Sequence, residues 1–493
     1  MNDLPPPAPV PPEPEPRPWS PTVLGPRAKV VVVTAGALAL VLAALFGRPA
    51  QLEREISTRA ALLDADVCAA AATYLPLFGE GALRGTSRQL AEQAQERLKR
   101  LLSRDGAEVR LRLAALAALE GDLGAARSYL SDFHSAAKPP WLEPLRKALA
   151  PNASSAAQLA AARILRDSEP RWAASALRRL LFASAGESEL ARAEQAAARR
   201  QGAVALLRLG VVFGVAGAAL LLGPLLLLGY LVWLSAQAAA SRQPDWQDPL
   251  PEHLPEAQPP RAPFPWTVLD GLAGAGLMLV VSATASAFWS ALFGGEKGGL
   301  PVVLGMAFSY LCAAFAVCAT VLFAPVWPAV EAARALGLRA VGRARAVFWG
   351  AGGLVAIYPI VAGIGVVMSR LFPNDGVSTN PVMAVILGAK SPVEVIILFL
   401  LVGLVAPVFE ELLFRGCVYG ALRTRMSAGW AAVLSAVLFS LLHMDWFMVP
   451  QLVVIGVMLA HLRERTGSLF PAMVAHGLLN GGQLAVIVLL KGL

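Results

Sequence analysis

Long apolar runs constrain the fold of this chain more than any other feature of its sequence. The longer runs approach the roughly 20 apolar residues that an α-helix needs to cross the hydrocarbon core of a bilayer. The 493 residues are 56% hydrophobic and 15% charged, whereas soluble domains carry about 25% charged residues. We therefore predict an all-α, polytopic membrane protein with about nine transmembrane helices. The runs lie at 30–46, 209–234, 267–293, 300–323, 347–367, 393–419, 430–446, 447–461 and 468–490.

The segments between these runs differ in character and suggest how the chain is organised. The N-terminus is dense in proline, which favours a disordered or polyproline-like tail. Residues 50–200 are rich in Ala, Leu, Arg and Glu with apolar residues at helical spacing, which predicts a bundle of soluble helices. Gly and Pro should separate these helices at Gly106, Gly121, Pro139–Pro140 and Pro151. The predicted parts are a disordered tail at 1–28, a transmembrane anchor at 29–47, a soluble helical domain at 48–202, a transmembrane helix at 203–236, a proline-rich linker at 237–264 and a membrane core at 265–493.

The net charge of +8 does not indicate a nucleic-acid partner, because the basic residues lie in a polar stretch and beside apolar runs. There they anchor and orient membrane helices. Arginines in the loops after 323, 419 and 461 place those loops in the cytoplasm. Counting back from them places the N-terminus in the cytoplasm and residues 48–202 outside. The four cysteines form no CxxC pattern, and we predict no disulfide.

Two adjacent glutamates, Glu410 and Glu411, interrupt one of the apolar runs. A carboxylate within hydrocarbon costs on the order of 2.5–3.5 kcal/mol, so it is rarely present without a function. Glu411 and Arg415 are four residues apart and can pair on one helix face, whereas Glu410 points about 100° away, beside apolar surface. We expect Arg415 to keep Glu411 ionised and Glu410 to act as a general base. The alternative for Glu411 and Arg415 is an ion pair that ends a transmembrane helix.

Two histidines lie on later apolar runs. His443 follows Phe439 by four residues, and His476 precedes Asn480 by four, so each pair shares one helix face. Imidazole and amide groups are costly in apolar surroundings, which favours a functional role over a purely structural one for the set as a whole. We expect no catalytic role for the other histidines, His134, His253 and His461.

The series Glu-Glu-x-x-x-Arg, Phe-x-x-x-His and His-x-x-x-Asn resembles the CPBP family of intramembrane proteases, which includes type II CAAX prenyl endopeptidases and bacterial relatives linked to bacteriocin processing or self-immunity. The likeness covers about residues 265–490. It implies an endopeptidase acting on a membrane-bound peptide or protein in a bacterial-type plasma membrane. It also implies that Glu410 and His443 activate water, that His476 and Asn480 stabilise the oxyanion, and that Glu411, Arg415 and Phe439 support the site.

The metal requirement stays open at this point. Glu410, His443 and His476 could furnish a three-ligand zinc site with an open position, but the same atoms could activate water without metal. The His-Glu-x-x-His pattern of zincins is absent from the sequence.

Geometry and function leave further alternatives. If the turn at 423–428 is cytoplasmic, Glu410 and His476 should lie in the inner half of the bilayer, with His443 roughly 20 Å farther along its helix. We expect a polar cavity that opens to the cytoplasm. The alternatives to a protease are a transporter or proton relay, disfavoured by the lack of an evident inverted repeat, and a non-catalytic scaffold or immunity protein. The sequence does not indicate the oligomeric state.

Overall fold

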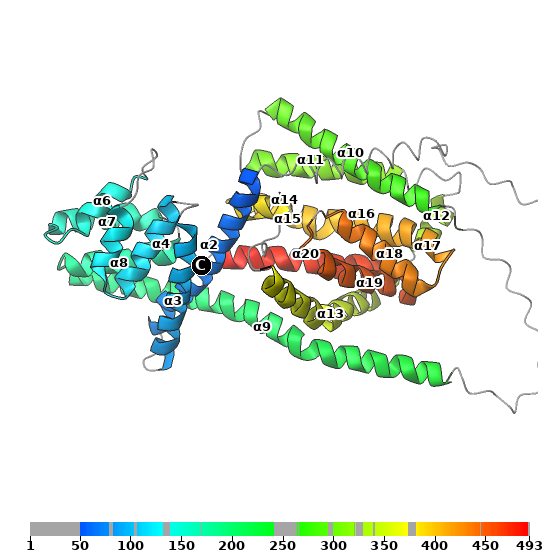
Figure 1. Ribbon diagram of the computed structural model, residues 1–493, viewed down its shortest axis with the longest axis horizontal. Helices are drawn as coiled ribbons and strands as arrows, with labels where there is room; N and C mark the ends of the chain where they lie inside the picture. Colours follow the sequence, from blue (N-terminus) through cyan, green and yellow to red (C-terminus); the bar gives the residue numbers. More distant parts are fainter. Residues whose placement is uncertain are drawn as a thin grey trace, which may run out of the picture.

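Every element that the structure describes is helical (Figure 1), which confirms the all-α prediction. The predicted tail at 1–28, the anchor at 29–47, most of the linker at 237–264, and His134 and His253 lie outside the described residues. This computed structural model describes residues 50–77, 82–102, 106–131, 139–168, 170–240, 264, 266–293, 299–319, 321, 329–338, 341–372, 381–443 and 445–491.

The N-terminal helices pack into one cluster around a core of buried Leu and Ala side chains. The predicted breaks fall at helix ends, and Gly121 adopts the positive φ of 82° that the turn between two helices requires. The helices are α2 (Ala50–Tyr74), α3 (Ala82–Leu101), α4 (Gly106–Leu119), α5 (Leu123–Ser131), α6 (Leu142–Ala148), α7 (Ser155–Ile164), α8 (Arg171–Ser184) and the first turns of α9 (Ser188–Ala240).

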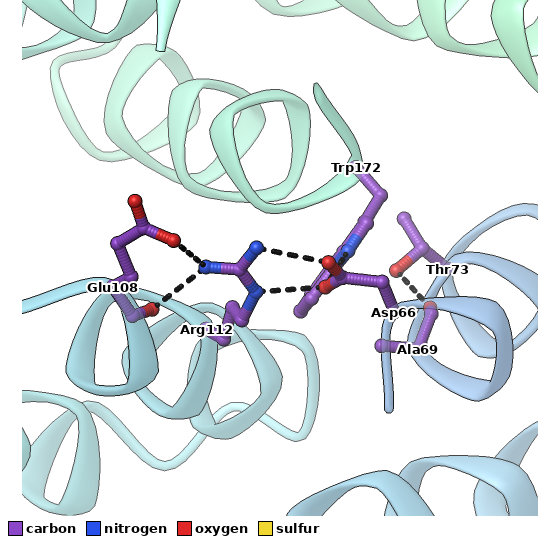
Figure 2. Close-up of polar contacts among 6 residues, drawn as sticks. All are labelled: Asp66, Ala69, Thr73, Glu108, Arg112 and Trp172. Atoms are coloured by element: carbon purple, nitrogen blue, oxygen red, sulfur yellow. Dashed lines mark hydrogen bonds and ion pairs between the residues drawn. The ribbon is translucent and has the colours of Figure 1, made fainter. Parts of the chain in front are cut away.

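A buried carboxylate ties three of these helices together (Figure 2). Asp66 of α2 accepts two hydrogen bonds from Arg112 of α4, at 2.8 and 2.9 Å, and one of 2.9 Å from the indole Nε1 of Trp172 in α8. Arg112 Nη1 also donates to the Glu108 carbonyl oxygen at 3.1 Å. Because the buried charges are paired and bidentate, the network fixes how α2, α4 and α8 pack.

Helix α9 joins the cluster to the membrane core without a break (Figure 1). Its first turns pack against α8, and its later part is apolar, with Leu207, Phe213 and Leu221 exposed by 64–75%. Large exposed apolar side chains on a continuous helix are typical of a lipid-facing surface. The boundary predicted between 202 and 203 therefore falls inside one helix.

The membrane core consists of helices running along one common direction (Figure 1). Helices α10 and α11 form one hairpin, α18 and α19 form another, and α13 contacts both α9 and α20. The elements are α10 (Val268–Phe293), α11 (Leu300–Cys318), α12 (Ala329–Leu336), α13 (Arg343–Leu371), α14 (Pro381–Gly388), the long segment from Pro392 to Arg423, α18 (Ala428–Leu441), α19 (Val449–Thr466) and α20 (Phe470–Lys491).

Seven of the described helices are long and apolar enough to cross a membrane. The chain is an integral membrane protein. The expected run at 30–46 lies outside the described residues. The runs at 430–446 and 447–461 form α18 and α19, which are not among the seven. Thr58–Leu77, which we assigned to the soluble domain, meets the length and composition of a span, although α2 also packs in the N-terminal cluster.

Replacing Asp66 by Ala should locally unfold the N-terminal cluster. The change leaves the guanidinium of Arg112 buried without its carboxylate, which costs about 3–5 kcal/mol. Hydrogen–deuterium exchange of the purified protein in detergent should show faster exchange in α4 and α8. The matched control is Glu92→Ala, which breaks a pair with Arg88 whose side chains are 60% and 81% exposed. Equal exchange in the two variants would contradict this account.

Candidate active site

The paired glutamates lie in a long helix that is widened on both sides of them. Residues Pro392–Leu400 form α15, and Ser391 caps it by accepting a hydrogen bond from the Glu394 backbone N–H. Two π-helical segments surround the glutamates, and π turns are rare and frequent at functional sites. The order is η4 (Leu401–Val405), α16 (Ala406–Glu411), η5 (Leu412–Val418) and α17 (Tyr419–Arg423).

Pro407 explains the first π segment. Proline has no N–H and its ring clashes with the carbonyl four residues earlier, so a regular α turn cannot form here. The Ala406 N–H bonds instead to the Leu401 carbonyl oxygen, five residues back. The Val402 carbonyl then has no helical donor, and the side-chain amide of Asn480 donates to it at 3.2 Å. Asn480 thus satisfies a carbonyl that the proline leaves open.

Glycines allow α20 to approach this widened segment closely. A Cβ atom added to Gly477 would lie 2.6 Å from the Gly403 carbonyl oxygen, and one added to Gly403 would lie 3.5 Å from Gly481 Cα. Such backbone contact is typical of small residues between membrane helices. The close approach brings His476, next to Gly477, against the paired glutamates.

Glu411 and Arg415 form a completely buried ion pair, as the helical spacing predicted. Arg415 Nη1 donates to Glu411 Oε1 at 2.8 Å, and both side chains are 0% exposed. The same oxygen lies 2.9 Å from His476 Nδ1. Because an ionised carboxylate only accepts hydrogen bonds, Nδ1 carries the hydrogen of this bond. Arg415 Nη2 also donates to the Gly456 carbonyl at 3.3 Å.

Glu410 points into a cavity of about 670 Å³. Its side chain is 19% exposed, and its Oε2 atom is buried with no hydrogen-bond partner in the described part of the chain. That oxygen lies 3.7 Å from His476 Nε2. Glu410 lines the cavity and is partly exposed, whereas Glu411 is 0% exposed and does not line it, so Glu410 is the carboxylate that a reacting molecule can reach.

His443, just beyond the end of α18, lines the same cavity. Its Nδ1 lies 2.9 Å from the Phe439 carbonyl oxygen, and since a carbonyl only accepts, Nδ1 is the donor. The Phe439 ring packs edge-to-face against both His443 and His476, with centroids 4.6 and 5.7 Å away. The Arg415 guanidinium lies over that ring at 4.4 Å. Phe439 thus joins the ion pair to the two imidazoles.

The expected separation of His443 from Glu410 was wrong. Glu410 precedes the helix end at Arg423 by 13 residues, and His443 follows the helix start at Ala428 by 15 residues. Each distance is about 20 Å along a helix, and the two helices rise antiparallel from one turn, so the side chains lie at the same level. We had placed Glu410 too near the turn because the apolar run ended before the helix did.

The cavity runs away from that turn. Its lining on α10 and α11 extends to Phe293 and Pro301, at the end of the bundle opposite Arg423, whereas we expected it to open at the end carrying the turn. Most lining side chains are apolar. Ser282, Ser286 and Ser290 form a polar stripe at intervals of four along α10.

No group of three His, Cys, Asp or Glu side chains among the described residues is placed to hold a metal ion. Glu410 and His443 line the cavity, but His476 does not, so the three zinc ligands considered from sequence do not all line one space.

Comparisons with known proteins agree with the motifs. Residues 392–482 match the family model described as type II CAAX prenyl endopeptidase Rce1-like. The membrane-embedded CAAX protease MroQ of Staphylococcus aureus (strain USA300) is 27% identical over 134 residues. Both matches support the assignment of the membrane core to the CPBP protease family. The alignment covers 26% of this chain and 52% of MroQ, so it spans about half of that relative. No solved structure matches the chain.

All seven predicted CPBP motif residues lie inside the matched segment. Glu410, Phe439 and His443 line the cavity. Glu411, Arg415 and His476 lie behind them, where Arg415 and His476 contact the Phe439 ring. Asn480 instead faces the Val402 carbonyl and does not line the cavity. The lining residues of α10 and α11 lie outside the match, and sequence reasoning missed them. The serine spacing on α10 was a usable signal, whereas Tyr310, which also lines the cavity, gave none.

Replacing Gly477 by Ala should destabilise the protein. The new methyl group would force α20 away from the Gly403 carbonyl, and overpacking of this kind costs about 1–3 kcal/mol. Thermal unfolding in detergent should show a lower midpoint for this variant. Gly482→Ala is the control on the same helix, because nothing lies within 4 Å of its added Cβ. The same shift in both variants would exclude close packing as the cause.

Proposed function

We propose that this chain is an intramembrane endopeptidase that hydrolyses a peptide bond of a membrane-associated substrate beside Glu410. The observation that carries the proposal is one cavity lined by both Glu410 and His443, with the Glu410 side chain 19% exposed and the neighbouring Glu411 completely buried. The family match supports a protease over a transporter or scaffold.

Glu410 is the general base of the proposed reaction. Its carboxylate accepts a proton from water, whose oxygen attacks the carbonyl carbon of the substrate. Protonated Glu410 then gives the proton to the leaving amine as the C–N bond breaks. His443 contributes the acceptor Nε2 that orients the water, because its Nδ1 is held by Phe439. No step in this scheme requires a metal ion.

His476 couples the two glutamates. Its Nδ1–H donates to Glu411 while its Nε2 faces Glu410, so the buried ion pair sets the orientation of the ring. An imidazole held in this way can share the proton that Glu410 receives. Glu411 and Arg415 act through His476 and are positioning residues.

The oxyanion of the tetrahedral intermediate needs a hydrogen-bond donor within the cavity. Asn480, which the family resemblance suggested for this task, donates to Val402 in this structure and is proposed here as a positioning residue. Tyr310 lines the same cavity as Glu410, and its phenol is the donor that we propose instead.

The cavity favours a substrate that lies extended along α10. Its apolar walls suit a membrane-embedded peptide, and the serine stripe offers hydroxyls to the peptide backbone. We keep the proposed topology, with the N-terminus in the cytoplasm and residues 48–202 outside a bacterial-type plasma membrane. The cavity then extends from mid-bilayer toward the outer side.

Cleavage of membrane peptides by the purified protein in detergent tests the proposal. Glu410→Gln should lose at least a thousandfold in kcat, because it removes the base, and His443→Ala should lose about a hundredfold. His461→Ala is the control, since His461 pairs with Tyr230 and does not line the cavity. Equal cleavage by all variants would refute the assignment. Loss of activity with chelator and recovery with zinc would refute the metal-free scheme.

Asn480→Ala and Tyr310→Phe should behave differently in the same assay. Loss of the Asn480 amide leaves the Val402 carbonyl unsatisfied, which lowers stability by about 1–3 kcal/mol, and kcat should fall less than tenfold. Loss of the Tyr310 hydroxyl should lower kcat by roughly a hundredfold or more while the unfolding midpoint stays unchanged. A reversal of these two patterns would return the oxyanion role to Asn480.

A further inference from the structure

A second cavity, of about 310 Å³, lies within the N-terminal helical cluster. It is independent of the proposed protease site, since the two cavities share no lining residue. Its walls are mostly polar, and it surrounds the start of α8. The lining residues are Arg166, Ser168, Arg171, Ala174, Ser175, Arg178, Glu194 and Gln201.

The charge in this cavity is positive. Three arginines line it against one glutamate, and Glu194 Oε2 already pairs with Arg178 Nη2 at 3.0 Å. The N-terminus of α8 adds the positive end of a helix, and no side chain caps it. Guanidinium groups at a helix N-terminus are the donors that recognise phosphate oxygens.

Two buried donors have no partner in the described structure. Ser175 is 3% exposed, and its Oγ atom makes no hydrogen bond although it lines the cavity. Arg178 Nε is likewise buried without an acceptor. Buried polar atoms are normally hydrogen-bonded, so a ligand with acceptor oxygens would supply the partners that these two donors lack.

The cavity lies near the point on α9 where its exposed apolar surface begins. Helix α8 packs antiparallel to α9, and Gln201 of α9 lines the cavity. Val204 and Leu207 follow on the same helix and are 49% and 68% exposed. Arg208 comes next, and the continuous apolar run starts at Leu209, eight residues or about 12 Å beyond Gln201. The headgroup region is roughly 5–7 Å thick on each side of the hydrocarbon core, so long arginine side chains at the cavity must extend toward a lipid phosphate.

We propose that this cavity binds the phosphate group of an anionic phospholipid. The phosphate oxygens accept hydrogen bonds from Arg166, Arg171 and Ser175, while the acyl chains follow the apolar surface of α9. Soluble phosphate has the same oxygens, but only a lipid also covers the exposed apolar side chains beyond Gln201.

Native mass spectrometry of the full-length protein in detergent tests this site. Phosphatidylglycerol, phosphatidylcholine and inorganic phosphate are titrated separately. The wild-type protein should retain one phosphatidylglycerol at least tenfold more tightly than phosphatidylcholine. The double variant R166Q/R171Q, at two exposed positions, should weaken the binding of phosphatidylglycerol about tenfold or more. Ser175→Ala keeps every charge and should weaken it severalfold.

The matched control is R88Q/R163Q, which removes two exposed arginines that do not line the cavity. Its affinity for phosphatidylglycerol should stay within twofold of wild type. Equal losses in the two double variants, or equal affinity for the two lipids, would overturn the proposal. Displacement of phosphatidylglycerol by millimolar inorganic phosphate would identify a free phosphate site and would also overturn it.

Discussion

A charged pair withdrawn completely from solvent supports the rest of the membrane core. Glu411 and Arg415 lie among apolar helices, where each ion alone would cost several kcal/mol. The ion pair uses only some of the donors and acceptors of the two side chains, so other groups also contact them. These are His476, the Gly456 carbonyl and the face of Phe439. The contacts of this ion pair thus position His476 and Phe439 next to the cavity.

Backbone irregularity provides the room for these contacts. Pro407 interrupts the regular α-helical hydrogen bonds of the long helix, and the residues before it form a π segment. The side-chain amide of Asn480 donates to the Val402 carbonyl oxygen of that segment. Gly403 and Gly477 then let two backbones meet, which places His476 beside both carboxylates. The shape of the site thus depends partly on residues that do not line the cavity.

Much of this arrangement could be predicted from sequence because it depends on local spacing. The pairing of Glu411 with Arg415 and the Ser391 cap follow from intervals of three or four residues on a helix. Other features depend on packing between distant segments. The common level of Glu410 and His443 required the true helix ends, and Tyr310 enters the cavity from a helix with no recognisable motif. The role of Asn480 depended on a π turn that no periodicity reveals.

The central claim is that Glu410 and His443 act as one unit on a single water molecule, and a double-mutant cycle tests it most directly. Mild variants, Glu410→Asp and His443→Gln, keep residual cleavage measurable alone and together. Groups that act as a unit show strongly non-additive losses. We predict that the double variant loses little more kcat than the worse single variant. Losses that multiply would show that the two side chains act independently, which contradicts the account.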